Sequence, residues 1–123
     1  TPGTLATFIG ALEDAGVDVW DISCWHESRR GYFGTGTWLP DWVRRTSAKP
    51  RIVAGNILTP DDAATYIAEG HAEVAALARA LIGDAEWVNK ARAGRPDDIR
   101  PWQESYTPAL KQGVDSGAVH EKI

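Results

Sequence analysis

The chain has 123 residues, 43% of them hydrophobic, and a formal net charge of −4 from 13 basic and 17 acidic residues. This length allows one ordinary domain at most, or a piece of one. Because the basic residues form no stripe and no apolar run is long enough to span a bilayer, we expect neither nucleic acid nor a membrane as a partner. Cys24 is the only cysteine, which excludes an internal disulfide and fits a reducing compartment such as the cytoplasm.

The first part of the chain reads as a helix followed by a strand. Apolar residues at helical spacing over 5–12 predict the helix, with Thr4 as its N-cap and Gly16 just past its end. The run 17–23 is rich in β-branched and aromatic residues and predicts the strand.

Another helix and strand come after a long connection. Three glycines and the lack of a clear period indicate a loop over 24–38, and Pro40 falls in the first turn of a short helix predicted over 39–49. The short apolar run 50–55 predicts a second strand, buried on both faces of a sheet.

The helix after this strand has complete end signals. Thr59 suits the N-cap, Pro60 suits the first helical position, and Gly70 follows the last turn. A third strand is predicted over 72–78.

Shorter elements are expected beyond the third strand. The stretch "RALIG", residues 79–83, predicts a short extra helix, and Asp84 is the predicted cap of a helix over 85–93 that Gly94 ends. We expect residues 103–123 to form a loosely packed tail.

The alternation of strands and helices predicts an α/β fold with parallel strands, and three strand–helix units are visible. A complete (β/α)8 barrel needs about 250 residues, so this chain has room for roughly the last half of one, and we expect residues 1–123 to form such a partial TIM-barrel domain. A small open α/β sheet is the other structural option.

Two consecutive strand ends carry residues that suit a phosphate group. Gly55 and Asn56 follow the second predicted strand, and Ala78 and Arg79 follow the third. Ligands of parallel sheets bind at the carboxyl ends of the strands, and a phosphate needs backbone N–H groups that no side chain obstructs. Arg79 adds a permanent positive charge. We interpret these residues as a phosphate cradle, while a glycine after a strand is also typical of a plain turn.

The segment 53–100 resembles the C-terminal part of the old yellow enzyme family, the NADH:flavin oxidoreductases. It shares a strand that ends in glycine, a Thr-Pro helix start, an acidic strand that leads into "RALIGD", and a helix that ends before "GRPDDIRP". Upstream, "LEDAGVDVWDIS" at 12–23 resembles the sixth helix and strand of the family. Together the likeness covers about the first four-fifths of the chain.

This resemblance implies a TIM barrel that carries FMN and moves hydride from NAD(P)H, through the flavin, to an activated alkene or a similar acceptor. The residues that would hold the FMN phosphate are Gly55, Asn56, Ala78 and Arg79. The family usually has glycine at the position of Ala78 and proline at the position of Ala85; neither change removes the cradle.

The stretch "CWHESR", residues 24–29, resembles a word of the 2,4-dienoyl-CoA reductase branch in which the histidine lies at the active site. The resemblance makes His26 a candidate proton donor or substrate-orienting residue, and a solvated loop histidine is the alternative. That branch also holds an iron–sulfur cluster, which a chain with one cysteine cannot bind, and Trp102 stands in the place of its first cluster cysteine. We predict no metal site, since His71 and His120 read as ordinary surface residues.

The first half of the barrel, which in this family contacts the flavin ring and the substrate, is not found in these 123 residues. Three readings stay open. The chain is a segment of an FMN oxidoreductase that acts with the missing half or with a copy of itself, another phosphate-binding barrel enzyme, or a non-catalytic remnant or interaction module. The family words quoted above favour the first reading over the second, and turnover of NAD(P)H separates the first from the third.

Overall fold

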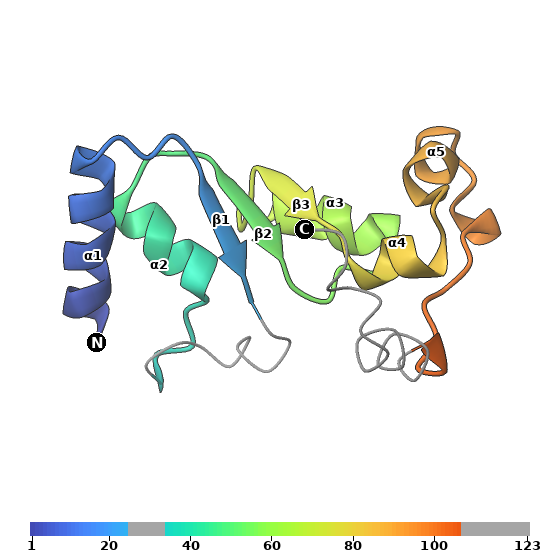
Figure 1. Cartoon of the computed structure of the whole chain (residues 1–123), viewed down its shortest axis with the longest axis horizontal. Coiled ribbons are helices and arrows are strands. Elements are labelled where there is room, and N and C mark those ends of the chain that lie inside the picture. Colours follow the sequence, from blue (N-terminus) through green and yellow to red (C-terminus); the bar gives the residue numbers. More distant parts are fainter. Residues whose placement is uncertain (25–33, 107–123) are drawn as a thin grey trace, which may run out of the picture. The chain divides into compact units, whose positions relative to one another are not determined.

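The computed structural model of the chain describes residues 1–24 and 34–106 (Figure 1). The chain divides into two compact units, Thr1–Ala78 and Arg79–Ile123. Within the described ranges, no helix is long and apolar enough to cross a membrane.

The first unit is an α/β structure in which helices and strands alternate. Its elements are α1 (Pro2–Asp14), β1 (Trp20–Ser23), α2 (Leu39–Thr46), β2 (Arg51–Ala54), α3 (Pro60–Ala68) and β3 (Val74–Ala76). The three strands form one sheet in the order β1-β2-β3, and both neighbouring pairs are parallel. The prediction of an α/β fold with parallel strands is therefore confirmed, with strands shorter than expected.

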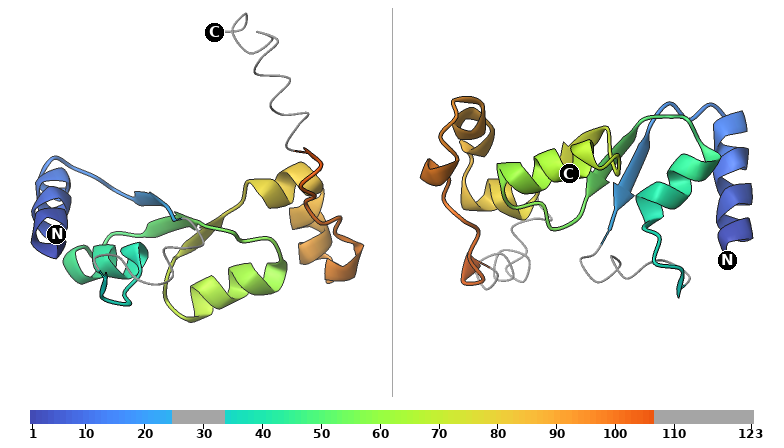
Figure 2. Two further views of the ribbon diagram at one scale, coloured as in Figure 1. Left: turned by 90° about the horizontal axis from the view of Figure 1, so that it is seen from below. Right: turned by 180° about the vertical axis from the view of Figure 1, so that it is seen from behind.

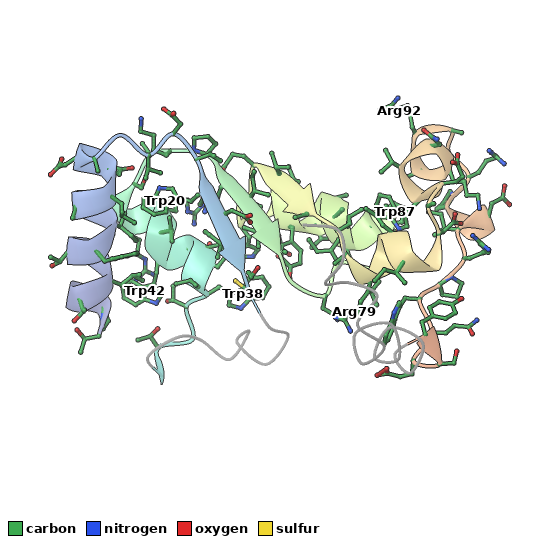
Figure 3. All side chains as sticks on the ribbon, viewed as in Figure 1. Trp20, Trp38, Trp42, Arg79, Trp87 and Arg92 are labelled. Carbon is green, nitrogen blue, oxygen red and sulfur yellow. The ribbon has the colours of Figure 1, made fainter. Side chains whose placement is uncertain are left out.

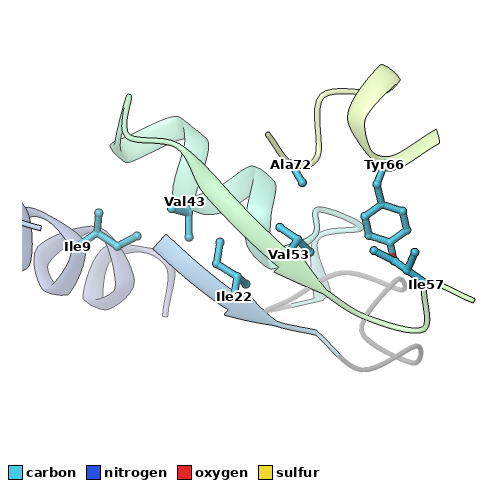
Figure 4. Close-up of a cluster of buried hydrophobic side chains, with 7 residues drawn as sticks. All are labelled: Ile9, Ile22, Val43, Val53, Ile57, Tyr66 and Ala72. Atoms are coloured by element: carbon cyan, nitrogen blue, oxygen red, sulfur yellow. The ribbon is translucent and has the colours of Figure 1, made fainter. Parts of the chain in front are cut away.

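The core of this unit lies between the sheet and the helices α2 and α3, which cover the same face of the sheet (Figure 2). Ile22 of β1 and Val53 of β2 are register partners, and Val53 is completely buried. Val43 of α2 and Tyr66 of α3 pack into the same cluster (Figure 4). Side chains of a strand alternate between its two faces, so every second strand residue joins this core.

The opposite face of the sheet is less covered in the described residues. Asp21 and Ser23 of β1 are exposed, Ile52 and Ala54 of β2 are half-buried, and Val74 of β3 is 49% exposed. The prediction that the second strand is buried on both faces is thus wrong for the described chain: β2 is fully buried on the helix-covered face and only half-buried on the other.

A buried arginine joins the ends of several elements. Arg51, 2% exposed, donates to the carbonyl oxygens of Pro40 (3.0 Å) and Gly70 (3.1 Å) and to the carboxylate of Glu73 (2.6 and 3.0 Å). The pKa of Glu73 is lowered, first by the side-chain hydrogen bond from Arg51. A buried guanidinium needs this many acceptors, since an unpaired buried charge is very costly.

The helix ends follow the sequence signals closely at α3 and less closely at α1. Thr59 is the N-cap of α3, and its hydroxyl and the Asp62 carboxylate exchange hydrogen bonds with each other's backbone N–H groups in a capping box. For α1 the N-cap is Thr1, whose hydroxyl accepts from the Thr4 N–H, so the assignment of Thr4 as the cap was wrong. Gly16 lies just past the helix with a φ of 99°, as its position predicted.

The second unit contains α4 (Arg79–Gly83), α5 (Trp87–Arg92) and the 3₁₀ helix η3 (Pro96–Asp98). The cap of α5 is Glu86, not Asp84 as predicted. The predicted tail begins with residues 103–106, and its remainder, 107–123, lies outside the described residues.

Asp84 is instead a buried anchor of the second unit, 1% exposed. Its carboxylate accepts from Lys90 Nζ (2.6 Å) and from the backbone N–H groups of Glu86 (3.0 Å) and Arg100 (2.9 Å). The hydrogen bond from Lys90 is the main cause that lowers the pKa of Asp84 well below its ordinary value. Asp84, which lies between α4 and α5 in the sequence, thus connects the start of this helical region to the segment after η3 through Arg100.

Candidate functional site

The carboxyl ends of β2 and β3 lie side by side. Ala54, the last residue of β2, is the register partner of Ala76, the last residue of β3. Gly55 and Asn56 therefore leave the sheet next to Leu77 and Ala78, at the edge where parallel α/β proteins bind their ligands. The sequence-based expectation that these two strand ends are neighbours is confirmed; their role toward a phosphate is a proposal, taken up below.

Gly55 has a packing reason to be glycine. A Cβ at this position would lie 2.6 Å from the carbonyl oxygen of Cys24, which is backbone and has no rotamer by which to move away. Cys24 itself donates its backbone N–H to Ala54 (2.7 Å), and the hydroxyl of Tyr66 donates to the Gly55 carbonyl (2.8 Å). The end of β2 is thus fixed between the end of β1 and helix α3.

Asn56 takes an unusual backbone conformation directly after Gly55. Its φ is 53°, and among the described residues it is the only non-glycine residue with a positive φ. Asparagine is one of the few residues that tolerate this left-handed region, because its short side chain makes local hydrogen bonds. The chain therefore turns sharply at the end of β2.

Ala78 and Arg79 follow the end of β3. Ala78 is exposed, and Arg79 is the half-buried first residue of α4 (Figure 3). Within the second unit, the Arg79 guanidinium carbon lies 5.2 Å from the ring centroid of Trp102, in the range of a cation–π contact.

His26, the tentative catalytic residue, lies outside the described residues, and so does His120. Cys24 is described and is half-buried at the end of β1. Burial raises the pKa of its thiol to about 11, and the charge of Asp41 adds to the shift. At neutral pH this group is therefore a thiol rather than a thiolate.

His71, read as an ordinary surface residue, is held in a cluster between α2 and α3, so that prediction was wrong. Its Nδ1 lies 3.0 and 3.1 Å from the two Asp41 carboxylate oxygens, and its Nε2 lies 3.2 Å from Glu69. Its ring stacks on Trp38, with 4.5 Å between the ring centroids. No signal in the local sequence brings Asp41 and His71 together, because they are 30 residues apart and meet only through packing.

No metal site is evident in the described part of the chain. There, no group of three or more histidine, cysteine, aspartate or glutamate side chains is arranged to hold a metal ion.

The profile of the NADH:flavin oxidoreductase / NADH oxidase family matches residues 3–98. The chain belongs to this family. The matched range includes all three strands of the sheet and both candidate strand ends, so the family assignment and the strand arrangement concern the same residues.

Three curated relatives support the assignment. The chain is 33% identical over 101 residues to a metal reductase of Desulforamulus reducens and 36% identical over 97 residues to an NADH oxidase of Thermoanaerobacter brockii. It is 32% identical over 108 residues to a bilirubin reductase of Clostridium symbiosum. These alignments cover 76%, 72% and 78% of this chain, respectively.

The chain spans only a small part of these relatives. The aligned region is 15% of the metal reductase, 15% of the NADH oxidase and 29% of the bilirubin reductase.

The strand ends have the chemistry that a flavin phosphate requires. Gly55, Asn56 and Ala78 carry no charged side chain, and Arg79, a permanent cation, follows Ala78 directly in the sequence. At one of the two ends the backbone turns at Asn56, whose φ is positive. The residues present therefore fit a phosphate group.

Proposed function

We propose that this chain is the phosphate-binding end of an FMN-dependent NAD(P)H oxidoreductase of the ene-reductase type. The observation that carries the proposal is the side-by-side ending of β2 and β3 at Ala54 and Ala76, in a chain whose residues 3–98 match the flavin oxidoreductase family. In the proposed whole protein, the parallel sheet is the C-terminal half of a TIM barrel, and its less covered face is the barrel interior.

The flavin, when bound, would take a hydride from NAD(P)H and pass it to an acceptor such as an activated alkene. The proposed work of this chain is to hold the cofactor. Backbone N–H groups at Gly55, Asn56 and Ala78 would bind the phosphate oxygens, and the Arg79 guanidinium would neutralise part of the phosphate charge.

This chain is proposed to hold only the phosphate, so the contacts to the flavin ring and the substrate must come from elsewhere. We propose that they come from the preceding half of the barrel or from a second copy, since the β1 and β3 edges of the sheet are unpaired in the described residues. His26 stays a candidate proton donor. Cytoplasmic location stays a prediction from the single cysteine.

The test is the flavin content and reactivity of the protein at its natural length. We expect a yellow preparation whose flavin, released by denaturation, is FMN, and which oxidises NADH or NADPH when an α,β-unsaturated ketone is supplied. A colourless preparation that also fails to bind added FMN would refute the proposal. Bound FMN without any oxidation of NAD(P)H would instead favour a non-catalytic module.

A further inference from the structure

The Arg79 side chain lies against an aromatic ring from a segment more than twenty residues later in the second unit. Its guanidinium carbon is 5.2 Å from the ring centroid of Trp102. A guanidinium presents its donors in a rigid planar fork, so a ring that contacts it restricts where those donors lie. An arginine in solvent has many rotamers and loses that freedom when it binds an anion.

Two interactions place Trp102 next to α4. Asp84, directly after α4, accepts the backbone N–H of Arg100 at 2.9 Å. Gly83, the last residue of α4, is buried against the following segment: a Cβ there would lie 2.8 Å from the Trp102 nitrogen and 3.0 Å from its Cα. The backbone of residues 100–102 thus lies directly on the end of α4.

The helical spacing then explains why the indole reaches Arg79. Arg79 and Gly83 are four residues apart, about one helical turn, so they share one face of α4. Because the Trp102 backbone contacts Gly83 on this face, the Trp102 ring lies within reach of Arg79, one turn earlier in α4.

The indole N–H does not explain the position of Trp102. Trp102 Nε1 is buried and has no hydrogen-bond partner among the described residues. A buried donor without a partner costs free energy, so the ring must be held by its contacts rather than by its polar atom. A phenylalanine would keep a ring and remove the unpaired donor.

We propose that Trp102 is a positioning residue that holds the Arg79 guanidinium ready for the flavin phosphate. The proposal rests on the proposed function, in which Arg79 meets that phosphate. Trp102 touches no part of the cofactor in this scheme. Trp102 restricts the Arg79 side chain before binding, so less conformational entropy is lost when the phosphate binds and the affinity for FMN is higher.

The experiment compares FMN with riboflavin, which lacks the phosphate. Dissociation constants are measured from flavin fluorescence on the flavin-free protein at its natural length, for the wild type and for Arg79→Gln, Trp102→Leu, Trp102→Phe and the double variant Arg79→Gln/Trp102→Leu. Arg92→Gln, which removes an exposed arginine of the same unit, is the matched charge control. Thermal unfolding of each variant verifies that it is folded.

We expect Arg79→Gln to weaken FMN binding about tenfold or more, because a charge-assisted hydrogen bond to the phosphate is lost. Trp102→Leu should weaken it about threefold to tenfold, and Trp102→Phe should restore most of the loss. Riboflavin affinity should stay unchanged in all variants. In the Arg79→Gln background, Trp102→Leu should have no further effect, and Arg92→Gln should match the wild type.

Two failures are distinguishable. If Arg79→Gln leaves FMN affinity unchanged, the phosphate assignment is wrong, and the role of Trp102 falls with it. If Arg79→Gln weakens FMN binding but Trp102→Leu does not, the phosphate assignment stands and the positioning role is overturned. The positioning role is equally overturned if Trp102→Leu weakens FMN and riboflavin alike, or if its effect adds in full to that of Arg79→Gln.

Discussion

Replacing Gly55 by alanine tests whether the end of β2 is as tightly placed as the structure requires. The new Cβ would lie 2.6 Å from the Cys24 carbonyl oxygen. A carbon and a carbonyl oxygen normally approach no closer than about 3.3 Å, so the backbone must move by about 0.7 Å. That movement strains the hydrogen bond from Cys24 to Ala54, which is 2.7 Å long.

The expected net cost is about 1–2 kcal/mol of unfolding free energy. Overpacking of this kind costs about 1–3 kcal/mol, and the lower chain entropy of alanine in the unfolded state returns about 0.4–1 kcal/mol. Urea denaturation followed by tryptophan fluorescence measures the change, because Trp20 and Trp38 lie in the same unit as the substitution.

Gly10→Ala is the matched control. Gly10 lies inside α1, and an added Cβ would meet no atom within 4 Å beyond its chain neighbours and the backbone of its own helix, so the same substitution should stabilise the protein by about 0.5–1 kcal/mol. If Gly55→Ala shifts the transition to higher urea as Gly10→Ala does, the close approach of Cys24 to Gly55 is wrong. Since Gly55 is needed for packing, loss of flavin in a Gly55 variant alone would not establish a phosphate contact.

Three further predictions concern the supports of the fold. Asp84→Asn should destabilise the protein at pH 7. The pKa of Asp84 is lowered on folding, mainly by Lys90, so its carboxylate contributes to the free energy of unfolding above about pH 4, and this contribution is lost as the pH falls further. The urea unfolding curves of variant and wild type should therefore converge in acid. Cys24, with its pKa raised to about 11, should react slowly with iodoacetamide at pH 7 and faster as the pH approaches 11, and rapid labelling at pH 7, followed by mass spectrometry, would contradict its burial. Thr59→Ala should cost about 1 kcal/mol by loss of the α3 capping box, whereas Thr65→Ala on the exposed side of the same helix should be nearly neutral in denaturant titrations.

Local signals in the sequence predicted those parts of the fold that depend on neighbouring residues. The helix α3 was predicted with its cap, its first turn and its final glycine, because Thr59, Pro60 and Gly70 act through backbone geometry within one or two turns. The parallel pairing followed from the alternation of strands and helices. The cap of α1 was predicted at Thr4 and lies at Thr1, because threonine suits the N-cap at either position and local preference does not distinguish them.

Long-range contacts could not be predicted from the sequence. Arg51 begins a strand and is buried only because Pro40, Gly70 and Glu73 converge on it through the fold. Asp84 has the sequence features of a cap, yet its carboxylate accepts hydrogen bonds from Lys90 Nζ and from the backbone N–H of Arg100 in a later segment.

In the candidate site, too, some features could be predicted from the sequence and others depend on long-range contacts. The adjacency of the two strand ends was predictable, because parallel neighbours end at the same edge of the sheet. The contact between Cys24 and Gly55 and the contact between Arg79 and Trp102 were not, since both pairs are more than twenty residues apart in the sequence.

The most direct measurement is a crystal structure of the natural-length protein with FMN bound. The proposed function predicts the flavin phosphate within about 3 Å of backbone nitrogens in both strand-end segments, 55–56 and 78–79, with the Arg79 guanidinium on the same phosphate. A flavin phosphate bound at any other strand end, or a complex in which either segment turns its nitrogens away from it, would contradict the proposal.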